Sequence, residues 1–287
     1  MIGTIPDEVQ VLDRLEIIFL QYNSGITGKI PPFHKMEQLR HLALQWCGLE
    51  GTIPSWIGSM TNLAYLGLGN NKLTGQVPIE LGNLKNLELL GLDDNMLSAN
   101  VELFADLPKL QSLYLEDNQI TGSISNALLY SWPKLQELDL SGNQLTGSLP
   151  NSFFQHYNDL KVVDLHDNDL EGLFPGDISE NTQLEFLALN RNKFTGNLPD
   201  SITNLKSLRH LDLNGNSFKT LPESLGQLTK LKYLNVGENG FPSGEIPRFL
   251  IELTNLRELG LKALRLTGTI PNFIHYLSNL EYLDLRK

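Results

Sequence analysis

The sequence lacks several features that define common classes of protein. Its 287 residues include one cysteine, Cys47, so no disulfide can form within the chain. No apolar run approaches the roughly 18 residues of a membrane-spanning helix, so any membrane anchor would lie outside this sequence. Lys and Arg number 22 against 33 Asp and Glu, and the net charge of -11 would repel a phosphate backbone. The composition therefore argues against a nucleic-acid partner and favours a neutral or cationic one.

Catalytic and metal-binding motifs are also missing. The sequence contains no H-E-x-x-H, no paired C-x-x-C, no G-x-S-x-G and no G-x-x-x-x-G-K-[ST], and its 6 histidines show no ligand spacing. The segment VDLHDNDLEG (163–172) resembles a calcium loop when it is read from Asp167. The twelfth place of that loop, which needs a bidentate glutamate, is Ile178. We therefore expect no enzymatic activity, no metal site and no cofactor.

One repeat organises the whole chain. The pattern L-x-x-L-x-L-x-x-N-x-L-x-G-x-I-P recurs every 23 to 25 residues, and its first leucine falls at Leu15, Leu39, Leu63, Leu87, Leu110, Leu135, Leu160, Leu184, Leu208, Leu231, Leu256 and Leu280. This regularity predicts a single solenoid domain over residues 1–287 with about 12 repeats. Both ends fall within a repeat and lack polar caps, which indicates a fragment of a longer protein or a chain that covers its ends by association.

Each repeated position has a physical reason. Segments such as LRHLALQWC alternate in the manner of short strands, with leucines inward and variable residues outward, and stacked strands would form a parallel sheet. The asparagine in ninth place can satisfy buried backbone groups of neighbouring coils. Cys47 and Leu264 replace it in two repeats; a thiol can partly serve as a donor, whereas leucine predicts a local rearrangement or an unsatisfied carbonyl near it. Apolar residues three apart after each I-P predict short helices or 3₁₀ turns.

The L-x-G-x-I-P half of the repeat resembles the plant-type class of leucine-rich repeats over residues 15 to 287. The resemblance implies an α/β right-handed solenoid, or horseshoe, with a concave parallel β-sheet and short helices or 3₁₀ turns on the convex side. It also implies binding, as in receptor-like protein ectodomains and polygalacturonase-inhibitor-like proteins. Localisation stays open. The resemblance points to the cell surface or secretion, whereas the missing signal peptide, Asn-x-Ser/Thr acceptors and cap cysteines point away from it.

The outward positions of the strands form the candidate site. Neighbouring strands lie about 4.8 Å apart, so we expect Asp139 beside Asp164, and Asp93 beside Glu116, in an acidic centre that a cationic partner would relieve. Aromatic side chains accompany these acids at the same outward positions. The candidate ligand-binding residues on the concave face are Phe19, Tyr22, His41, Trp46, Tyr65, Asp93, Tyr114, Glu116, Asp139, Asp164, His166 and Phe186.

Charged residues on an open sheet face also keep a protein soluble, so the acidic centre has two explanations, solvation and ligand binding. The leading hypothesis is a non-enzymatic module that recognises a protein or peptide on the concave face, within a larger receptor-like protein. The alternatives are a scaffold that assembles through uncapped ends and an inhibitor of a secreted enzyme.

Overall fold

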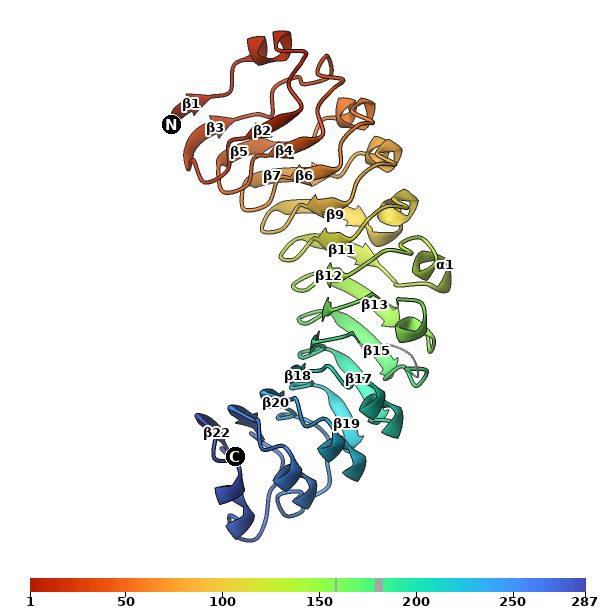
Figure 1. The fold of residues 1–287 in the computed structure, drawn as a ribbon, viewed down its shortest axis with the longest axis vertical. Helices are drawn as coiled ribbons and strands as arrows, with labels where there is room; N and C mark the ends of the chain where they lie inside the picture. Colours follow the sequence, from red (N-terminus) through yellow and green to blue (C-terminus); the bar gives the residue numbers. More distant parts are fainter. Residues whose placement is uncertain (158, 179–182) are drawn as a thin grey trace. The chain divides into compact units, whose positions relative to one another are not determined.

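The computed structural model describes residues 1–157, 159–178 and 183–287. The chain divides into two compact units, Met1–Leu145 and Thr146–Lys287. Within each unit, successive coils stack on one another, and their short strands lie on the opposite side of the coil from the short helices (Figure 1). Among the described residues, no helix is long and apolar enough to cross a membrane. The fold is the leucine-rich repeat solenoid that the repeat predicts.

A parallel sheet in the first unit collects the strands that carry the paired leucines. Leu42 pairs with Ile18 on one side and with Leu66 on the other, so inward residues at the same position of successive repeats form a continuous row. The leucines at 39, 42 and 44 are fully buried, which confirms the inward positions of the pattern. The strands are β2 (Ile17–Phe19), β4 (His41–Ala43), β6 (Tyr65–Gly67), β8 (Leu89–Gly91), β10 (Ser112–Tyr114) and β12 (Glu137–Asp139).

A second parallel sheet, which the sequence analysis did not anticipate, follows the turn in each coil. Its strands contain the L-x-G segment, and a glycine with positive φ, such as Gly75 at 80°, lies within or at the end of most of them. In the first unit these strands are β1 (Ile2–Thr4), β3 (Gly25–Gly28), β5 (Gly48–Gly51), β7 (Lys72–Gln76), β9 (Met96–Asn100) and β11 (Gln119–Gly122); β13 (Gln144–Ser148) begins there and ends in the second unit.

The second unit repeats this arrangement. Its first sheet contains β14 (Val162–Asp164), β16 (Phe186–Ala188), β18 (His210–Asp212), β20 (Tyr233–Asn235), β21 (Glu258–Gly260) and β22 (Tyr282–Asp284). Its second sheet continues from β13 through β15 (Asp169–Leu173) and β17 (Lys193–Asn197) to β19 (Ser217–Thr220). The register between β17 and β19 shifts at Gly196 and Asn197, opposite the repeat that begins at Leu208 and has 23 residues.

Short helices cover the opposite side of the coils, as predicted. A proline immediately precedes most of them, because its fixed φ suits the start of a helix and its missing N–H is not needed there. They are η1 (Asp7–Val11), η2 (Ser55–Ser59), η3 (Ile79–Asn83), η4 (Val101–Asp106) and α1 (Asn126–Leu129) in the first unit, and η5 (Phe153–Gln155), η6 (Asp200–Asn204), η7 (Glu223–Gln227), η8 (Arg248–Glu252) and η9 (Asn272–Tyr276) in the second.

The asparagine ladder joins neighbouring coils as predicted. The Asn95 amide donates to the carbonyls of Leu68, Leu92 and Asp93 at 2.9 to 3.1 Å, and its oxygen accepts from the Leu73 N–H at 2.9 Å. One side chain therefore satisfies backbone groups of its own coil and of the preceding coil.

Cys47 replaces this asparagine only in part. Its buried thiol donates to the Leu20 carbonyl at 3.3 Å, which confirms the predicted donor role, and burial raises the pKa of the thiol. A thiol offers the neighbouring coil no amide oxygen. The Ile26 N–H therefore donates to the backbone carbonyl of Asn23 at 2.8 Å.

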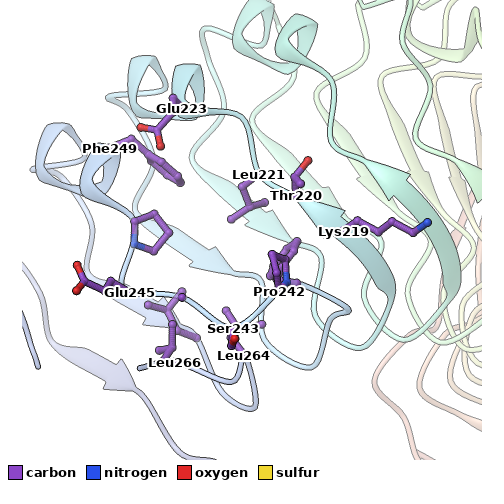
Figure 2. Close-up of a pocket in the computed structure, with 14 residues that line it drawn as sticks. Lys219, Thr220, Leu221, Glu223, Pro242, Ser243, Glu245, Phe249, Leu264 and Leu266 are labelled. Carbon is purple, nitrogen blue, oxygen red and sulfur yellow. The ribbon is translucent and has the colours of Figure 1, made fainter. Parts of the chain in front are cut away.

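The chain is rearranged around Leu264, as its missing amide predicts. The second sheet ends at β19, and beyond it the corresponding segments form a single bridge, Gly244 to Leu266. Pro242 lies in the segment that would otherwise pair with β19, and proline has no N–H for the ladder. An apolar pocket of about 250 Å³ occupies this gap; Phe249 and Leu221 point toward it, and Leu264 lies at its lower edge (Figure 2).

Candidate functional site

The predicted site lies on the strand face, by which we mean the outward side chains of the first sheet of each unit together with the turn residues that follow each strand. Each coil contributes two outward strand residues, one more residue after the strand and one turn residue. In the coil of β4 these are His41, Ala43, Gln45 and Trp46. The strand face of the first unit carries nine of the twelve candidate residues, and that of the second unit carries Asp164, His166 and Phe186.

The turn residue has an unusual backbone conformation in each of the first eleven coils. It precedes the ladder position and has φ between 47° and 65°, the left-handed region that favours glycine, asparagine and aspartate. Most coils carry one of these types there, for example Asn70, Asp94 and Gly142. Arg191, Glu238 and Ala263 also adopt this conformation at the turn. The first two coils carry the aromatic residues Tyr22 (φ 62°) and Trp46 (φ 55°), for which this region is unfavourable.

Tyr22 and Trp46 stack on one another and stay open to solvent. Their ring centroids lie 6.2 Å apart with planes 19° from parallel, and the residues are 75% and 51% exposed. Behind them, His41 lies edge-on to Phe19 at 6.4 Å and stacks on Tyr65 at 6.1 Å. The structure thus brings together the five N-terminal aromatic and histidine candidates in two neighbouring ring groups.

A hollow of about 230 Å³ opens beside the stacked pair, and we call it the Trp46 hollow. It is lined by Gln21, Tyr22, Gln45, Trp46, Tyr65, Leu89, Gly91, Asp93 and Tyr114. Two glycines leave room for side chains that line the hollow. A Cβ at Gly67 would lie 1.9 Å from Gln45 Nε2, and one at Gly69 would lie 2.1 Å from Asp93 Oδ1, so these side chains occupy room that any other residue would fill. The glycines in the outward positions therefore shape a cavity as well as the sheet surface.

Several oxygen atoms at the Trp46 hollow have no hydrogen-bond donor. Gln45 Nε2 donates to the Tyr65 hydroxyl at 2.6 Å, but Gln45 Oε1 and Gln21 Oε1 are buried without a partner. One coil beyond Asp93, Glu116 Oε2 is also buried and unpaired. Acceptors in this state are unfavourable unless a ligand or water supplies a donor.

Two candidate acids of the first unit, Asp93 and Glu116, are protonated more readily than ordinary carboxyls. Burial raises the pKa of Glu116 to about 8, and the negative charges of Asp139 and Asp93 add to the effect. Burial also raises the pKa of Asp93, whose Oδ2 accepts from the Asn70 amide at 2.7 Å. The predicted repulsion between like charges is present, but burial is the larger cause.

Asp139 and Asp164 are engaged in local hydrogen bonds. Asp139 Oδ1 accepts from the N–H of Ser141 at 3.0 Å and from its hydroxyl at 2.6 Å. Asp164 Oδ1 accepts from the His166 N–H at 3.1 Å and lies 2.6 Å from His166 Nδ1. These contacts are typical of Asx turns, which stabilise the chain as it leaves a strand. The two aspartates lie in different units, so their predicted pairing across neighbouring strands stays a prediction.

The second unit carries a stack of three rings, of which only Phe186 is among the candidate residues. His210 stacks on Phe186 at 4.2 Å and on Tyr233 at 4.0 Å, with planes within 14° of parallel. Burial lowers the pKa of His210 to about 4, so the ring is neutral near pH 7. Tyr114 remains in the first unit, where its hydroxyl donates to the Glu137 carboxylate.

The sequence patterns did not identify Gln21 and Gln45, or Gly67 and Gly69, as part of the site. Gln21 and Gln45 occupy the same outward position as Asp93 and Glu116, so the repeat register could have identified them as neighbours of the candidate acids. Among the described residues, no group of three His, Cys, Asp or Glu side chains could hold a metal ion. The site is therefore a set of aromatic rings, acceptors and carboxyls on an open face.

Two family models match the chain, one described as "Leucine-rich repeat region" at residues 150–286 and one as "Leucine rich repeat" at residues 37–97 and 98–145. The chain belongs to the plant-type leucine-rich repeat family. Receptor-like protein 35 of Arabidopsis thaliana is 32% identical over 123 residues, which are 35% of this chain and 13% of that protein. The matched part of the chain thus spans a small fraction of this relative.

Solved structures extend the similarity to the whole chain. The structure of PEPR1–AtPEP1 superposes with a TM-score of 0.85 and 30% identity, over 100% of this chain and 47% of that chain. The plant peptide hormone receptor RGFR1 in complex with RGF2 gives a TM-score of 0.76 and 28% identity, over 99% of this chain and 53% of that chain. The chain therefore corresponds to about half of each of these solved chains.

Proposed function

We propose that the chain is a non-enzymatic recognition module that binds an extended peptide, or an extended segment of a protein, on its strand face. The observation that carries the proposal is the exposed stack of Tyr22 and Trp46 beside a hollow with unpaired acceptors. Exposed aromatic rings next to carboxyls are typical of residues that dominate protein interfaces. The similarity to RGFR1, a peptide hormone receptor, supports a peptide as the ligand.

The row of strands suits such a ligand physically. Each coil presents one set of outward side chains, and neighbouring coils lie about 4.8 Å apart, so a chain lying across the strands meets a new set at each step. The ring groups around Trp46 in the first unit and around His210 in the second supply apolar contact area. Carboxyls on the strand face of each unit would add specificity for cationic groups.

A displayed peptide library panned against the chain tests the proposal. Enriched peptides should bind the wild type and lose at least about tenfold in affinity with Tyr65→Ala combined with Trp46→Ala. Tyr130→Ala is the matched control, since Tyr130 is 72% exposed at the end of α1, on the helix side. Equal loss in the control, or binding that the double variant leaves intact, would overturn the strand face as the binding surface.

Within this proposal the chain serves as the ligand-binding part of a larger receptor-like protein. The relatives named receptor-like proteins are much longer than the stretches that match this chain, which supports that context. Inhibition of a secreted enzyme would use the same face and is the alternative that the panning experiment also addresses. Assembly through the terminal repeats stays a separate prediction, which sedimentation of the isolated chain at micromolar concentration tests.

A further inference from the structure

The Trp46 hollow contains acceptors that await donors. Gln21 Oε1 and Gln45 Oε1 are buried and unpaired, and Asp93 contributes a carboxyl whose Oδ2 accepts from the Asn70 amide. Both glutamine side chains are only partly buried as residues, so rotation of either amide can present its oxygen to a ligand in the hollow. A ligand that supplies several N–H groups would therefore satisfy atoms that the protein itself leaves unsatisfied.

The walls of the hollow favour a flat group. Tyr22 and Trp46 are 75% and 51% exposed as residues, and both have a backbone conformation that bulky residues avoid. Backbone strain of this kind clusters at ligand-binding sites, because the surrounding structure must hold it. Most other coils of the chain meet the same turn with asparagine, aspartate or glycine. The rings therefore occupy a position where the fold itself has no need of them.

The surrounding charge favours a cation. None of the outward positions on the six strands of the first sheet in residues 1–145, or directly after those strands, carries lysine or arginine. The same positions carry Asp93, Glu116, Glu137 and Asp139. Burial raises the pKa of Asp93 and raises that of Glu116 to about 8, so Glu116 is mostly protonated near pH 7. A cation should therefore bind more tightly as the pH rises and these carboxyls ionise.

We propose that the Trp46 hollow is a subsite for an arginine side chain of the bound peptide. The guanidinium lies against the faces of Trp46 and Tyr22 and donates to the oxygens of Gln21, Gln45 and Asp93. Arginine fits better than lysine, because its planar group stacks on aromatic rings and carries five donors in a fixed fork. A neutral sugar could also stack on the rings and donate from its hydroxyls to these oxygens, but it would leave the charge of an ionised Asp93 uncompensated. The inference rests on the proposed function and specifies one anchor of its ligand.

The experiment uses the full chain and three tripeptide probes, acetyl-Gly-Arg-Gly-amide and its citrulline and lysine counterparts. Citrulline has nearly the shape of arginine but no charge, so it separates charge from stacking. The chain has 3 tryptophans, and the indole N–H signals in a ¹H–¹⁵N spectrum report on each separately. We expect the arginine probe to shift the Trp46 signal in a saturable manner and to leave the signals of Trp56 and Trp132 in place. The citrulline probe should bind at least about tenfold more weakly, and the lysine probe about threefold more weakly.

Two variants test the contacts. Asp93→Asn keeps the shape of the side chain and removes its charge, and it should weaken the arginine probe about tenfold while leaving the citrulline probe unchanged. Asp106→Asn is the matched control, because Asp106 lies in η4 on the helix side and its side chain is 83% exposed. Thermal unfolding by circular dichroism shows that each variant is folded. The control should bind the arginine probe as the wild type does.

The inference is overturned if citrulline binds as tightly as arginine, if Asp93→Asn has no effect, or if cellobiose displaces the arginine probe at equal concentration. These failures are distinct from a failure of the proposed function. Library peptides that bind the strand face without any dependence on arginine would preserve the function and refute the arginine subsite. Saturable arginine binding at Trp46, with no library peptide retained by the strand face, would support the subsite and refute peptide recognition.

Discussion

The left-handed turn at Trp46 makes a specific prediction about stability. Trp46→Asn and Trp46→Ala both remove the indole and its stacking on Tyr22, so they lose the same ring contacts. They differ in the backbone, because asparagine visits the left-handed region readily and alanine does not. At φ 55°, Trp46→Asn should therefore be more stable than Trp46→Ala.

The magnitude follows from the cost of that conformation. A left-handed residue with an ordinary side chain costs about 1–2 kcal/mol, and asparagine avoids much of this, so the expected difference is about 1 kcal/mol in the free energy of unfolding. Trp56 supplies the matched control, because it lies in the 3₁₀ helix η2 and has no positive φ. At Trp56 the order of stability should reverse, and the free energy of unfolding of Trp56→Ala should exceed that of Trp56→Asn by about 0.5 kcal/mol.

Urea denaturation followed by tryptophan fluorescence measures both pairs. Trp132 is buried, donates to the Phe104 carbonyl at 2.8 Å and remains as a reporter in all four variants. The urea concentration at half-unfolding is compared between the two variants of each pair. Both variants of a pair lose the same ring, so their unfolding free energies should depend on urea concentration with nearly the same slope. Equal stability of Trp46→Asn and Trp46→Ala, or alanine ahead at both positions, would refute the argument that backbone strain is held at Trp46.

Three further predictions concern the ladder and the buried acid. Asn95→Leu should lower the free energy of unfolding by about 2 kcal/mol, because the Leu73 N–H loses its acceptor and the carbonyls of Leu68, Leu92 and Asp93 each lose one of two donors; an effect below about 1 kcal/mol in urea denaturation would contradict the ladder's role. Cys47→Asn should be neutral or stabilising and Cys47→Val destabilising by about 1 kcal/mol in the same assay, because asparagine offers the Ile26 N–H an acceptor and valine removes the thiol donor. The pKa of Glu116 is raised from 4.5 to about 8, so the folded state retains a proton that the unfolded state has lost in this range, and stability falls as pH rises. Glu116→Gln should therefore match the wild type at pH 4 and exceed it at pH 9, by at most about 2 kcal/mol after allowance for solvent screening of a partly exposed group; a pH-independent difference would refute this account.

The sequence was sufficient for most of the fold because each repeated residue has one structural task. The leucine pattern located the strands of the first sheet, the ninth-place asparagines located the ladder, and the exception at Leu264 predicted the rearranged coil. The second sheet was not predicted, because its strands contain glycine and span few residues, which is a weak strand signal. Pairing with identical segments in neighbouring coils forms those strands, and that is a property of the stack rather than of one segment.

The sequence predicted the aromatic part of the candidate site better than its polar contacts. Tyr22, His41, Trp46 and Tyr65 come together as their register implies. The role of Gln45 depends on the missing side chain of Gly67 one coil away, which no reading of a single repeat reveals. For the aspartates at the ends of strands, the sequence left solvation and ligand binding as two explanations, whereas in the structure Asp139 binds the backbone of its own turn.

The end of the second sheet at β19 has a consequence for how the protein opens. Up to β19, neighbouring coils of the second unit are joined by two hydrogen-bonded ladders, whereas the coils after Pro242 share one ladder and a single bridge. In a stack where each coil is stabilised by its neighbours, that seam is the weakest contact. Amide protons of β21 and β22 should therefore exchange with solvent earlier than those of β16 and β18. The residues from Pro242 onward would then behave as a separate unit of local unfolding, able to part from the stack while the coils before them stay closed.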